Sequence, residues 1–377
     1  MSTNGQTGQV LKSLRAADIS VCDEAASFLQ SGFWGRFKSR FGWEARAFLA
    51  EWENGETKPL LVLRRKIAFG IYLAYVPWGP ELPSEILCDR ASARARSIEE
   101  LAASLRGVLP KNTAFIRFDF PWFDLPKIDT SVPMPPSFVR SAVDVQVPDT
   151  VIIDLTQSIE SIMKNMKPKW RYNARLAQKR GVKVYQADEK KIDCFYSLLS
   201  ETAHRDGILI HGFEYYKTLF ETSCTDAEYF SGKNEVRLFL AEHESDVIAG
   251  IITLFRGKDA VYLYGASSDE KRNLMAPYAL QMKAMEDAKA YGCSQYDLFG
   301  IPPNEDPAHP MAGLYRFKTG FGGKIIHHAG CYDYPYQKIV YWFFRKAEKL
   351  RKKFMLLKKS QKIRKHFAQR DRDTDQP

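Results

Sequence analysis

The strongest constraint on the fold is an order of predicted elements that occurs twice along the chain. In each half, apolar runs of strand length and a longer amphipathic run predict three strands, a helix and a further strand. The first set spans about residues 43–120 and the second about residues 236–299. Because 377 residues are enough for two domains of ordinary size, we expect one domain from each set.

The boundary between the two domains is expected in a proline-rich stretch. Six prolines between Pro121 and Pro148 exclude a regular helix or central strand there. The elements predicted before it are strand Val10–Arg15, helix Val21–Phe41, strands Trp43–Glu51, Leu60–Arg65 and Phe69–Val76, helix Ser84–Leu109 and strand Ala114–Phe120. Those predicted after it are strand Val151–Leu155, helices Ser158–Met166, Lys169–Lys179, Lys191–Ala203 and Tyr215–Ser223, strands Val236–Glu242, Val247–Phe255 and Ala260–Tyr264, helix Pro277–Tyr291 and strand Gln295–Phe299.

The net charge of +10 is concentrated at the C-terminal end. Between Arg345 and Arg372 there are 13 Lys or Arg and two acids, a sum of +11, so the rest of the chain is close to neutral. Apolar residues recur there at helical spacing, which predicts a basic helix with one narrow apolar stripe. Such a helix can pack on its own protein by the stripe, lie on anionic lipid or bind RNA. The stripe consists of Val340, Phe343, Ala347, Leu350, Phe354 and Leu357.

A second basic run, from Lys164 to Arg180, contains no acidic residue and includes Trp170. Pro168 suits the first turn of a helix, and Gly181 suits its end. Like charges on one helix repel each other, which favours an anionic partner, although solvated basic helices are common. The candidates for RNA binding are Lys167, Lys169, Arg171 and Arg175.

The order of elements resembles that of acyltransferases of the GNAT type (GCN5-related N-acetyltransferases). The predicted fold class is therefore α/β (α+β), with two GNAT-like acyltransferase domains in tandem and a basic C-terminal helix. An acetyltransferase binds the pyrophosphate of coenzyme A on a glycine-rich turn at a helix start. The corresponding positions here, Arg272–Pro277, contain no glycine and end in a proline. A coenzyme A thioester is therefore disfavoured as the acyl donor.

Five motifs in order resemble the FemABX family, whose members move an amino acid from aminoacyl-tRNA onto a peptide amine of a peptidoglycan precursor. The likeness extends from about Phe28 to Tyr336 and fits the form without a long helical arm, because only about two dozen residues separate Gln178 from His204. The motifs are Phe28–Trp34 with Lys38, Lys167–Gly181, Tyr262–Ser268, Tyr296–Ile301 and Gly313–Gly323.

The resemblance implies a division of the chain into four parts. Residues 10–148 would form domain 1, which binds the acceptor, and residues 149–324 would form domain 2, which carries the transfer chemistry. Residues 325–336 would be a strand that returns to domain 1, and residues 337–377 the basic helix and tail.

The resemblance also assigns the transfer chemistry to two neighbouring residues. Lys318 matches the family lysine that stabilises the oxyanion formed when an amine attacks an aminoacyl ester. Phe317 would stack on the terminal adenosine of the donor. Spacing alone favours a surface lysine before a glycine-rich turn at Lys318, and only the motif context reverses that preference.

Acceptor binding is implied for a further set of residues. Lys38, one helical turn after Trp34, matches a lysine that contacts substrate phosphates. Asp119, at the end of an apolar strand, matches an acidic position facing the cleft, and Tyr264 matches one near the acceptor peptide. Without the resemblance, Lys38 is equally an exposed lysine. A carboxylate such as Asp119 at a strand end is also often a turn cap, and a strand tyrosine such as Tyr264 is more often a core residue.

One motif departs from the family pattern. His211, which precedes Tyr215 in a substrate-binding segment, stands where relatives often have an arginine. A histidine is mostly neutral at pH 7 and offers no two-pronged contact to a phosphate, so Arg205 or Arg175 would share that role. The general base is unassigned, and His204 and Asp297 are weak candidates for it.

The main functional prediction is a tRNA-dependent aminoacyltransferase that adds glycine, alanine or serine to a lipid-linked precursor (lipid II) or to UDP-MurNAc-pentapeptide. We expect a monomer with no metal or other cofactor. Because the N-terminus has no apolar leader, no run approaches a membrane span and the six cysteines form no CxxC pair, we expect a cytoplasmic protein, with peripheral contact at the inner membrane face. The alternatives are a FemAB-like acyltransferase of exopolysaccharide or other N-acylation pathways, and a non-enzymatic RNA or membrane tether.

Overall fold

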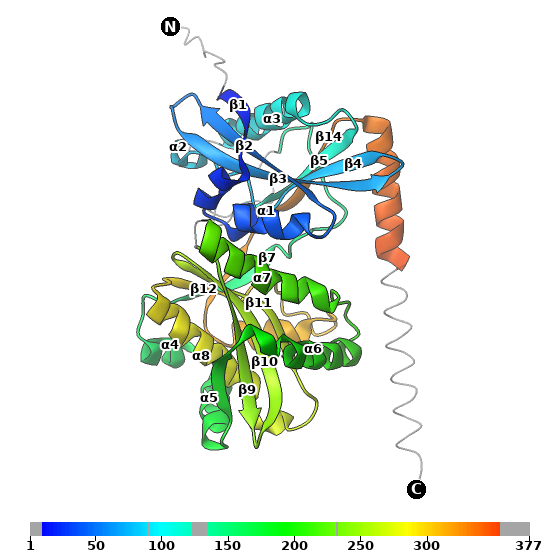
Figure 1. Ribbon diagram of the computed structural model, residues 1–377. Coiled ribbons are helices and arrows are strands. Elements are labelled where there is room, and N and C mark those ends of the chain that lie inside the picture. The colour runs from blue at the N-terminus through cyan, green and yellow to red at the C-terminus, as the bar shows by residue number, and fades with distance from the viewer. Residues whose placement is uncertain (1–9, 89–90, 123–133, 231–232, 355–377) are drawn as a thin grey trace.

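The computed structural model describes residues 10–88, 91–122, 134–230 and 233–354. Figure 1 shows two α/β domains, one above the other, with a helix near the C-terminus along one side. Each domain contains one seven-stranded sheet. The predicted α/β fold class and the prediction of two domains in tandem are confirmed.

The sheet of domain 1 has the strand order β1-β2-β3-β4-β5-β14-β6. Its neighbours are antiparallel except for β4 and β5, which are parallel and joined by a helical crossover. The strands are β1 (Leu11–Ala17), β2 (Glu44–Trp52), β3 (Thr57–Ala68), β4 (Ile71–Val76), β5 (Thr113–Phe120), β6 (Val139–Arg140) and β14 (Gly330–Pro335). The helices are η1 (Ile19–Glu24), η2 (Phe28–Gln30), α1 (Gly32–Ser39), α2 (Ser84–Cys88) and α3 (Ala91–Val108).

The sheet of domain 2 has the order β13-β7-β12-β11-β10-β9-β8. Its parallel pair, β11 and β12, is again joined through a helix, α8. The strands are β7 (Asp149–Asp154), β8 (Lys183–Ala187), β9 (Glu235–His243), β10 (Asp246–Arg256), β11 (Asp259–Ser267), β12 (Gln295–Asp297) and β13 (Lys324–His327). The helices are α4 (Ile159–Asn165), α5 (Pro168–Lys179), η3 (Glu189–Lys191), α6 (Ile192–Asp206), α7 (Phe213–Tyr229), η4 (Arg272–Leu274), α8 (Ala276–Tyr291) and α9 (Ala312–Thr319).

The two faces of the first sheet are buried against different partners. Side chains alternate between the faces along each strand, so Leu60 and Val62 of β3 pack with α3. Leu61 and Leu63 instead pack with α1 and with helices α6 and α7 of domain 2. One apolar core is therefore shared by the two domains, and it fixes the position of α1 against α7.

Buried polar contacts also cross the boundary between the domains. The guanidinium of Arg36 on α1 donates to the carboxylate of Asp226 on α7 and to Asp23, at 3.1 Å. Arg256 of β10 donates to the backbone carbonyls of Asp23 and Ala25 at 2.7 and 2.6 Å. A charged group buried with its partners is costly to separate, so these contacts hold the domains in one arrangement.

The predicted helix Val21–Phe41 is wrong. The structure has three short helices there, η1, η2 and α1, because polar side chains cap each start and compete with a continuous helix. Side-chain oxygens of Asp18, Ser27 and Ser31 accept N–H groups at the three starts. The Ser84–Leu109 helix is described as α2 and α3, with residues 89–90 between them outside the described chain.

The strand predicted to return to domain 1 is present but shorter than the predicted range 325–336. Lys324–His327 forms β13, which pairs with β7 in domain 2, and Gly330–Pro335 forms β14, which pairs with β5 in domain 1. β14 begins at Gly330, which has φ of 75°, a conformation that glycine adopts without strain. The chain thus passes between the two sheets within a few residues.

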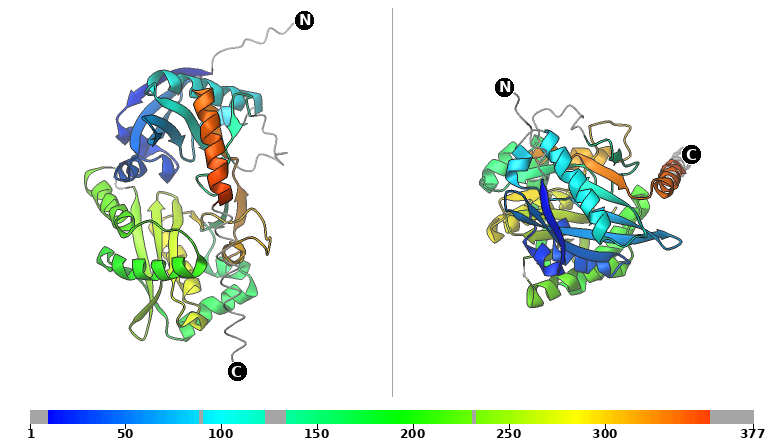
Figure 2. Two further views of the ribbon diagram at one scale, coloured as in Figure 1. Left: turned by 90° about the vertical axis from the view of Figure 1, so that its right-hand side faces the viewer. Right: turned by 90° about the horizontal axis from the view of Figure 1, so that it is seen from above.

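The C-terminal helix begins at residue 338 and is described to residue 354. It packs on domain 1 through Val340, Tyr341 and Phe344, beside Phe115. Val340 belongs to the predicted stripe, but Phe343 and Leu350 of that stripe are 63% and 68% exposed, so docking along the stripe, one of the three alternatives, is wrong. Leu357 lies outside the described residues. Figure 2 shows the helix standing along the outer side of domain 1.

No helix among the described residues has the length and apolar character needed to cross a membrane. The described link between α5 and α6 consists of β8, η3 and short turns, so it carries no long helical arm at that point.

Candidate functional site

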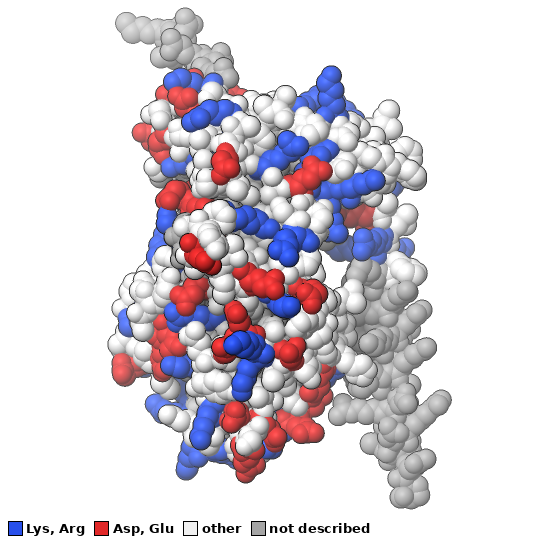
Figure 3. All heavy atoms as spheres, in the orientation of Figure 1, with Lys and Arg blue, Asp and Glu red and all other residues white. Residues whose placement is uncertain are grey.

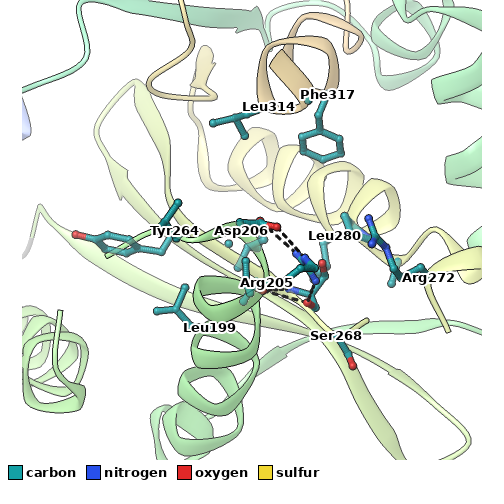
Figure 4. Close-up of a pocket in the computed structure, with 18 of the residues that line it drawn as sticks. Leu199, Arg205, Asp206, Tyr264, Ser268, Arg272, Leu280, Leu314 and Phe317 are labelled. Carbon is teal, nitrogen blue, oxygen red and sulfur yellow. Dashed lines mark hydrogen bonds and ion pairs between the residues drawn. The ribbon is translucent and has the colours of Figure 1, made fainter. Parts of the chain in front are cut away.

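The main cavity in the described chain lies in domain 2 and has a volume of about 1180 Å³. Helix α6, strand β11, the start of α8 and helix α9 surround it, and Figure 4 shows Leu314 and Phe317 of α9 pointing into it. A β-bulge in β11 helps to form its wall: Ile252 pairs with Tyr264 and the next residue pairs with Tyr262. Because a bulge re-aims side chains, Tyr262, Leu263 and Tyr264 all line the cavity.

Lys318 lines this cavity although its side chain is almost fully buried, with 6% exposure. Its ammonium donates to the carbonyl oxygens of Phe299 and Gly300 at 3.0 and 2.9 Å. The nitrogen also lies 5.2 Å from the centre of the Tyr262 ring. Burial lowers the pKa of Lys318 to about 7, against the opposing effect of Asp297. The two carbonyls thus hold the lysine ammonium in a fixed position at the cavity wall, and this ammonium loses its proton more readily than that of an exposed lysine.

Asp297 positions the turn that holds Lys318. Its carboxylate accepts the N–H of Phe299 at 2.7 Å and the hydroxyl of Thr150. Phe299 has φ of 58°, which is rare for an aromatic residue and directs its carbonyl toward the lysine. Burial raises the pKa of Asp297 to about 6. The structure therefore assigns Asp297 to positioning, while His204, the other weak base candidate, is exposed on α6.

Helix α5 supports α9 from behind. The indole N–H of Trp170 donates to the carbonyl of Phe317 at 2.8 Å, and the backbone N–H of Lys167 donates to the carbonyl of Gly320 at 2.9 Å. A Cβ on Gly320 would lie 2.1 Å from the Trp170 ring, so the two helices are in close contact there. The sequence did not indicate this role for Trp170.

The candidate RNA-binding residues surround this contact on α5. Lys167, Lys169 and Arg175 are exposed. Arg171 is half-buried and donates to the carbonyls of Lys164 and Met166. Three of the four side chains therefore face solvent, on α5 or directly before it, and α5 is the helix that supports α9 with Phe317 and Lys318.

The predicted acceptor residues form a second cluster, between the domains. Lys38 on α1 donates to the hydroxyl of Tyr215 on α7 at 3.5 Å. Its nitrogen also lies within 5.3–6.0 Å of four ring centres, those of Trp34, Phe37, Trp43 and Tyr215. Burial, followed by the charge of Arg65, lowers the pKa of Lys38 to about 8. A cation in such surroundings is stabilised by an added anion.

His211 connects this cluster with the cavity. Its ring stacks on Tyr215 at 3.8 Å, and it lines the cavity together with Tyr264. Burial and the nearby Lys38 lower the pKa of His211, so the ring is neutral near pH 7. The family resemblance implies one function, acceptor binding, for Lys38, Trp34, His211, Tyr215 and Tyr264. The structure places these five residues close to one another.

Asp119 lies apart from the domain 2 cavity, in the sheet of domain 1. It is fully buried and accepts from the Tyr75 hydroxyl and the backbone N–H of Gln146, both at 3.0 Å. Burial raises its pKa to about 6. The Tyr75 ring contacts Trp43, which is one of the rings around Lys38. Asp119 is thus linked to the acceptor cluster through two aromatic rings.

Of the two arginines considered as substitutes for a family arginine, Arg205 lines the same cavity as His211. Figure 4 shows it beside Asp206, and it also donates to the Ser267 carbonyl and to Asp269. Arg175 lies elsewhere, in a smaller hollow with Arg171.

The start of α8 does not offer the row of backbone N–H groups that binds a pyrophosphate. The N–H groups of Leu274, Met275 and Tyr278 are bonded to carbonyls within the turn, and Pro277 has none. Met275, before the helix, has φ of 59° and provides no side-chain cap. The geometry supports the expectation that coenzyme A is a poor ligand. The described residues also contain no cluster of three or more side chains suited to a metal ion.

Comparison with known proteins places these features in a family. The model of the FemAB family matches residues 139–231 and 225–349, together more than half of the chain. The lipid II:glycine glycyltransferase of Staphylococcus haemolyticus is 23% identical over 51% of this chain and 59% of its own length. That of Staphylococcus saprophyticus is 24% identical over 49% and 58%. This chain thus spans less than two thirds of the curated relatives that it matches.

The crystal structure of FemX has the same fold. It matches 88% of this chain and 100% of its own, with a TM-score of 0.74 and 18% sequence identity. The tandem arrangement of two sheets, the cavity in the second domain and the family-model match agree with one another. The chain belongs to the FemAB family.

Proposed function

We propose that this protein transfers the aminoacyl group of an aminoacyl-tRNA to the peptide-stem amine of a peptidoglycan precursor. Curated relatives are named for glycine transfer to lipid II. The amino acid proposed here is small, of the glycine, alanine or serine type. The acceptor is lipid II or UDP-MurNAc-pentapeptide, and no metal or nucleotide cofactor takes part.

The observation that carries this proposal is the position of Lys318 in a cavity that adjoins the Lys38 cluster through His211. His211 and Tyr264 line the cavity that contains Lys318, and His211 stacks on the tyrosine that accepts from Lys38. An ester carbonyl bound near Lys318 is therefore accessible to an acceptor whose phosphate binds at Lys38.

In the proposed reaction, Lys38 holds the acceptor and Lys318 stabilises the charge that develops on the donor ester. The acceptor nitrogen bonds to the ester carbonyl carbon, and the carbonyl oxygen gains negative charge, which the Lys318 ammonium stabilises. The carbonyl double bond then re-forms as the bond from that carbon to the ribose oxygen breaks, and the ribose oxygen leaves as a hydroxyl with the proton that the acceptor nitrogen loses. Since the pKa of Lys318 is about 7, a developing anion beside it favours the charged form.

The donor is proposed to bind along α5 and α9. The exposed basic side chains of α5 contact the tRNA backbone, and the Phe317 ring, which points into the cavity, stacks on the terminal adenine. Arg205 provides a cation at the same cavity wall.

The acceptor is proposed to bind between the domains. Lys38 contacts its phosphate. The remainder of the molecule is contacted by Trp34, His211, Tyr215 and Tyr264. Asp119, buried in domain 1, supports the cluster through its hydrogen bond from Tyr75, whose ring contacts Trp43. We place the reaction on the inner face of the cytoplasmic membrane, carried out by a monomer.

The test is a transfer assay with purified protein. Labelled glycyl-, alanyl- and seryl-tRNA are each offered with lipid II and with UDP-MurNAc-pentapeptide, with ribonuclease-treated and acetyl-CoA controls. The proposal expects label in the precursor with one of the tRNAs and none after ribonuclease treatment. Efficient transfer from acetyl-CoA, or no transfer from any of the three tRNAs, contradicts it.

A further inference from the structure

One edge of domain 1 carries two exposed aromatic segments that are distant in sequence. The hairpin between β3 and β4 and the C-terminal helix share one apolar cluster, in which Ile67 and Ile71 pack with Val340 and Phe344. Figure 2 shows the hairpin tip and the helix on the same side of the molecule. Neither segment belongs to the cavity or to the Lys38 cluster.

The C-terminal helix presents a second apolar face, opposite to its docked face. Successive residues of a helix are about 100° apart, which places Ile339, Trp342, Phe343 and Leu350 on the side away from Tyr341 and Phe344. These four side chains are 76%, 54%, 63% and 68% exposed. We call them the outer stripe. Burying such large apolar side chains is favourable, so a contiguous exposed stripe of them points to a partner.

The hairpin tip adds an aromatic side chain to this edge. Phe69 is 100% exposed and has φ of 40°, a conformation that is uncommon for a bulky residue. The hairpin holds it beyond Ile67 and Ile71, which are packed under the helix. A phenylalanine at an exposed tip gains little from its own fold.

The charges around the outer stripe are nearly all positive. Residues 338–354 contain seven Lys or Arg and one acid, Glu348. Glu348 lies on the docked side, where its carboxylate accepts from Arg117 at 2.9 and 3.0 Å. Lys346 lies between the aromatic residues of the stripe, 4.8 Å from the Trp342 ring. Figure 3 shows basic side chains beside uncharged surface along this edge, and mixed charges over the rest of that view.

We propose that the outer stripe and Phe69 form a surface that binds an anionic lipid bilayer. Aromatic and aliphatic side chains would enter the boundary between head groups and acyl chains, while the lysines extend to the phosphates. This deepens the proposed function and rests on it only in that a lipid-linked acceptor lies in such a bilayer.

The composition of the surface favours lipid over RNA and over a second copy of this chain. Ile339 and Leu350 offer nothing to an RNA backbone, whereas a hydrocarbon boundary accommodates them. A second copy of this chain would have to bury the lysines among the stripe residues, and lysine is depleted from the cores of protein interfaces.

The experiment measures cosedimentation of the full chain with vesicles of phosphatidylglycerol and phosphatidylcholine, and with vesicles of phosphatidylcholine alone. The variants are the double substitution Trp342→Ser/Phe343→Ser, Phe69→Ser, and Lys346→Glu/Lys353→Glu. The matched controls are Tyr229→Ser, at an exposed aromatic of α7, and Lys217→Glu on the same helix. Affinity for tRNA, sedimentation velocity and transfer to a water-soluble acceptor are measured in parallel.

We expect the wild type to bind the anionic vesicles and not the neutral ones. The double serine variant should bind about tenfold or more weakly, Phe69→Ser several-fold more weakly, and the charge-reversal variant about tenfold more weakly, while the two controls bind as the wild type does. Transfer to the soluble acceptor should be unchanged in all of them.

Three results would overturn the proposal. These are vesicle binding by the double serine variant equal to that of the wild type, loss of tRNA affinity in that variant without loss of vesicle binding, and a wild-type dimer that the variant converts to a monomer. Vesicle binding needs neither donor nor acceptor, so intact binding without any transfer would count against the proposed function and not against this surface.

Discussion

Replacing Lys318 with methionine should remove transfer activity while leaving acceptor affinity nearly unchanged. The lysine charge is required mainly when the oxyanion forms, and loss of one such donor costs about 3 kcal/mol, or a hundredfold or more in rate. Methionine has a similar length and suits the buried position, so the fold should persist. The measurement is the single-turnover rate of transfer together with the acceptor dissociation constant.

The same substitution should change how stability depends on pH. The pKa of Lys318 falls from 10.5 in the unfolded chain to about 7 in the folded one, so between these pH values the unfolded chain binds more protons. Stability of the wild type therefore rises with pH across that window. At 1.36 kcal/mol per pH unit well inside it, the wild type should gain about 2 kcal/mol between pH 7 and 9 relative to Lys318→Met. Urea unfolding at the two pH values measures the difference.

The matched control for both measurements is Lys190→Met, at an exposed lysine outside the site. It should keep the wild-type rate and the wild-type pH dependence. The loss of the Lys318 hydrogen bonds to the two carbonyls affects stability at both pH values alike, so it cancels in the comparison. A Lys318→Met rate within a few-fold of the wild type would remove the lysine from the mechanism, and parallel pH profiles would refute its lowered pKa.

Three further sets of substitutions test, one by one, acceptor binding, donor binding and the contact by which Trp170 supports α9. Lys38→Glu should weaken acceptor binding about tenfold or more, with tRNA affinity unchanged in a filter-binding assay, and equal loss of both would indicate a general folding defect. Lys169→Glu/Arg175→Glu should weaken tRNA binding and lower the slope of log affinity against log salt by about 2, whereas an unchanged slope would exclude α5 from the RNA interface. Trp170→Phe keeps the ring but loses the bond to the Phe317 carbonyl, so the transfer rate should fall about two- to tenfold at constant tRNA affinity. A wild-type rate would show that this bond is not needed.

The order of strands and helices could be predicted from the sequence because apolar periodicity depends on burial by the chain's own sheets. Leu60, Leu61, Val62 and Leu63 of β3, for example, form a continuous apolar run of strand length in the sequence, and the structure buries this run on both faces of the sheet. The failures arose where local side-chain hydrogen bonds decide the backbone. Ser27 and Ser31 each cap a new turn, and periodicity does not register that competition.

The candidate site was predictable in part through motifs. The position of Lys318 and the grouping of Lys38 with Tyr215, which are 177 residues apart, follow from the family likeness and not from spacing. The burial that lowers the pKa of Lys318 could not be predicted, because it depends on the left-handed turn at Phe299 and on Tyr262 from another strand. The supporting contact of Trp170 was hidden for the same reason.

Docking of the C-terminal helix by the predicted stripe was the wrong one of the three alternatives, because apolar residues lie on two opposite faces of this helix and the sequence does not show which face packs. The helical spacing selected Phe343 and Leu350, and only the surface of domain 1 determines that Tyr341 and Phe344 pack instead. The sequence thus identified an apolar face correctly, but it left three contacts open for that face, and only the structure excludes docking along it.

The most direct test of the central claim is the mass of the reaction product. Purified protein is incubated with a pool of aminoacyl-tRNAs carrying isotope-labelled amino acids and with lipid-linked muropeptide, and fragment masses locate any addition. The account predicts a mass increase of one or more small amino acid residues on the stem-peptide amine, absent after ribonuclease treatment and absent with Lys318→Met. An unchanged muropeptide mass, or an addition that persists after ribonuclease treatment, would contradict it.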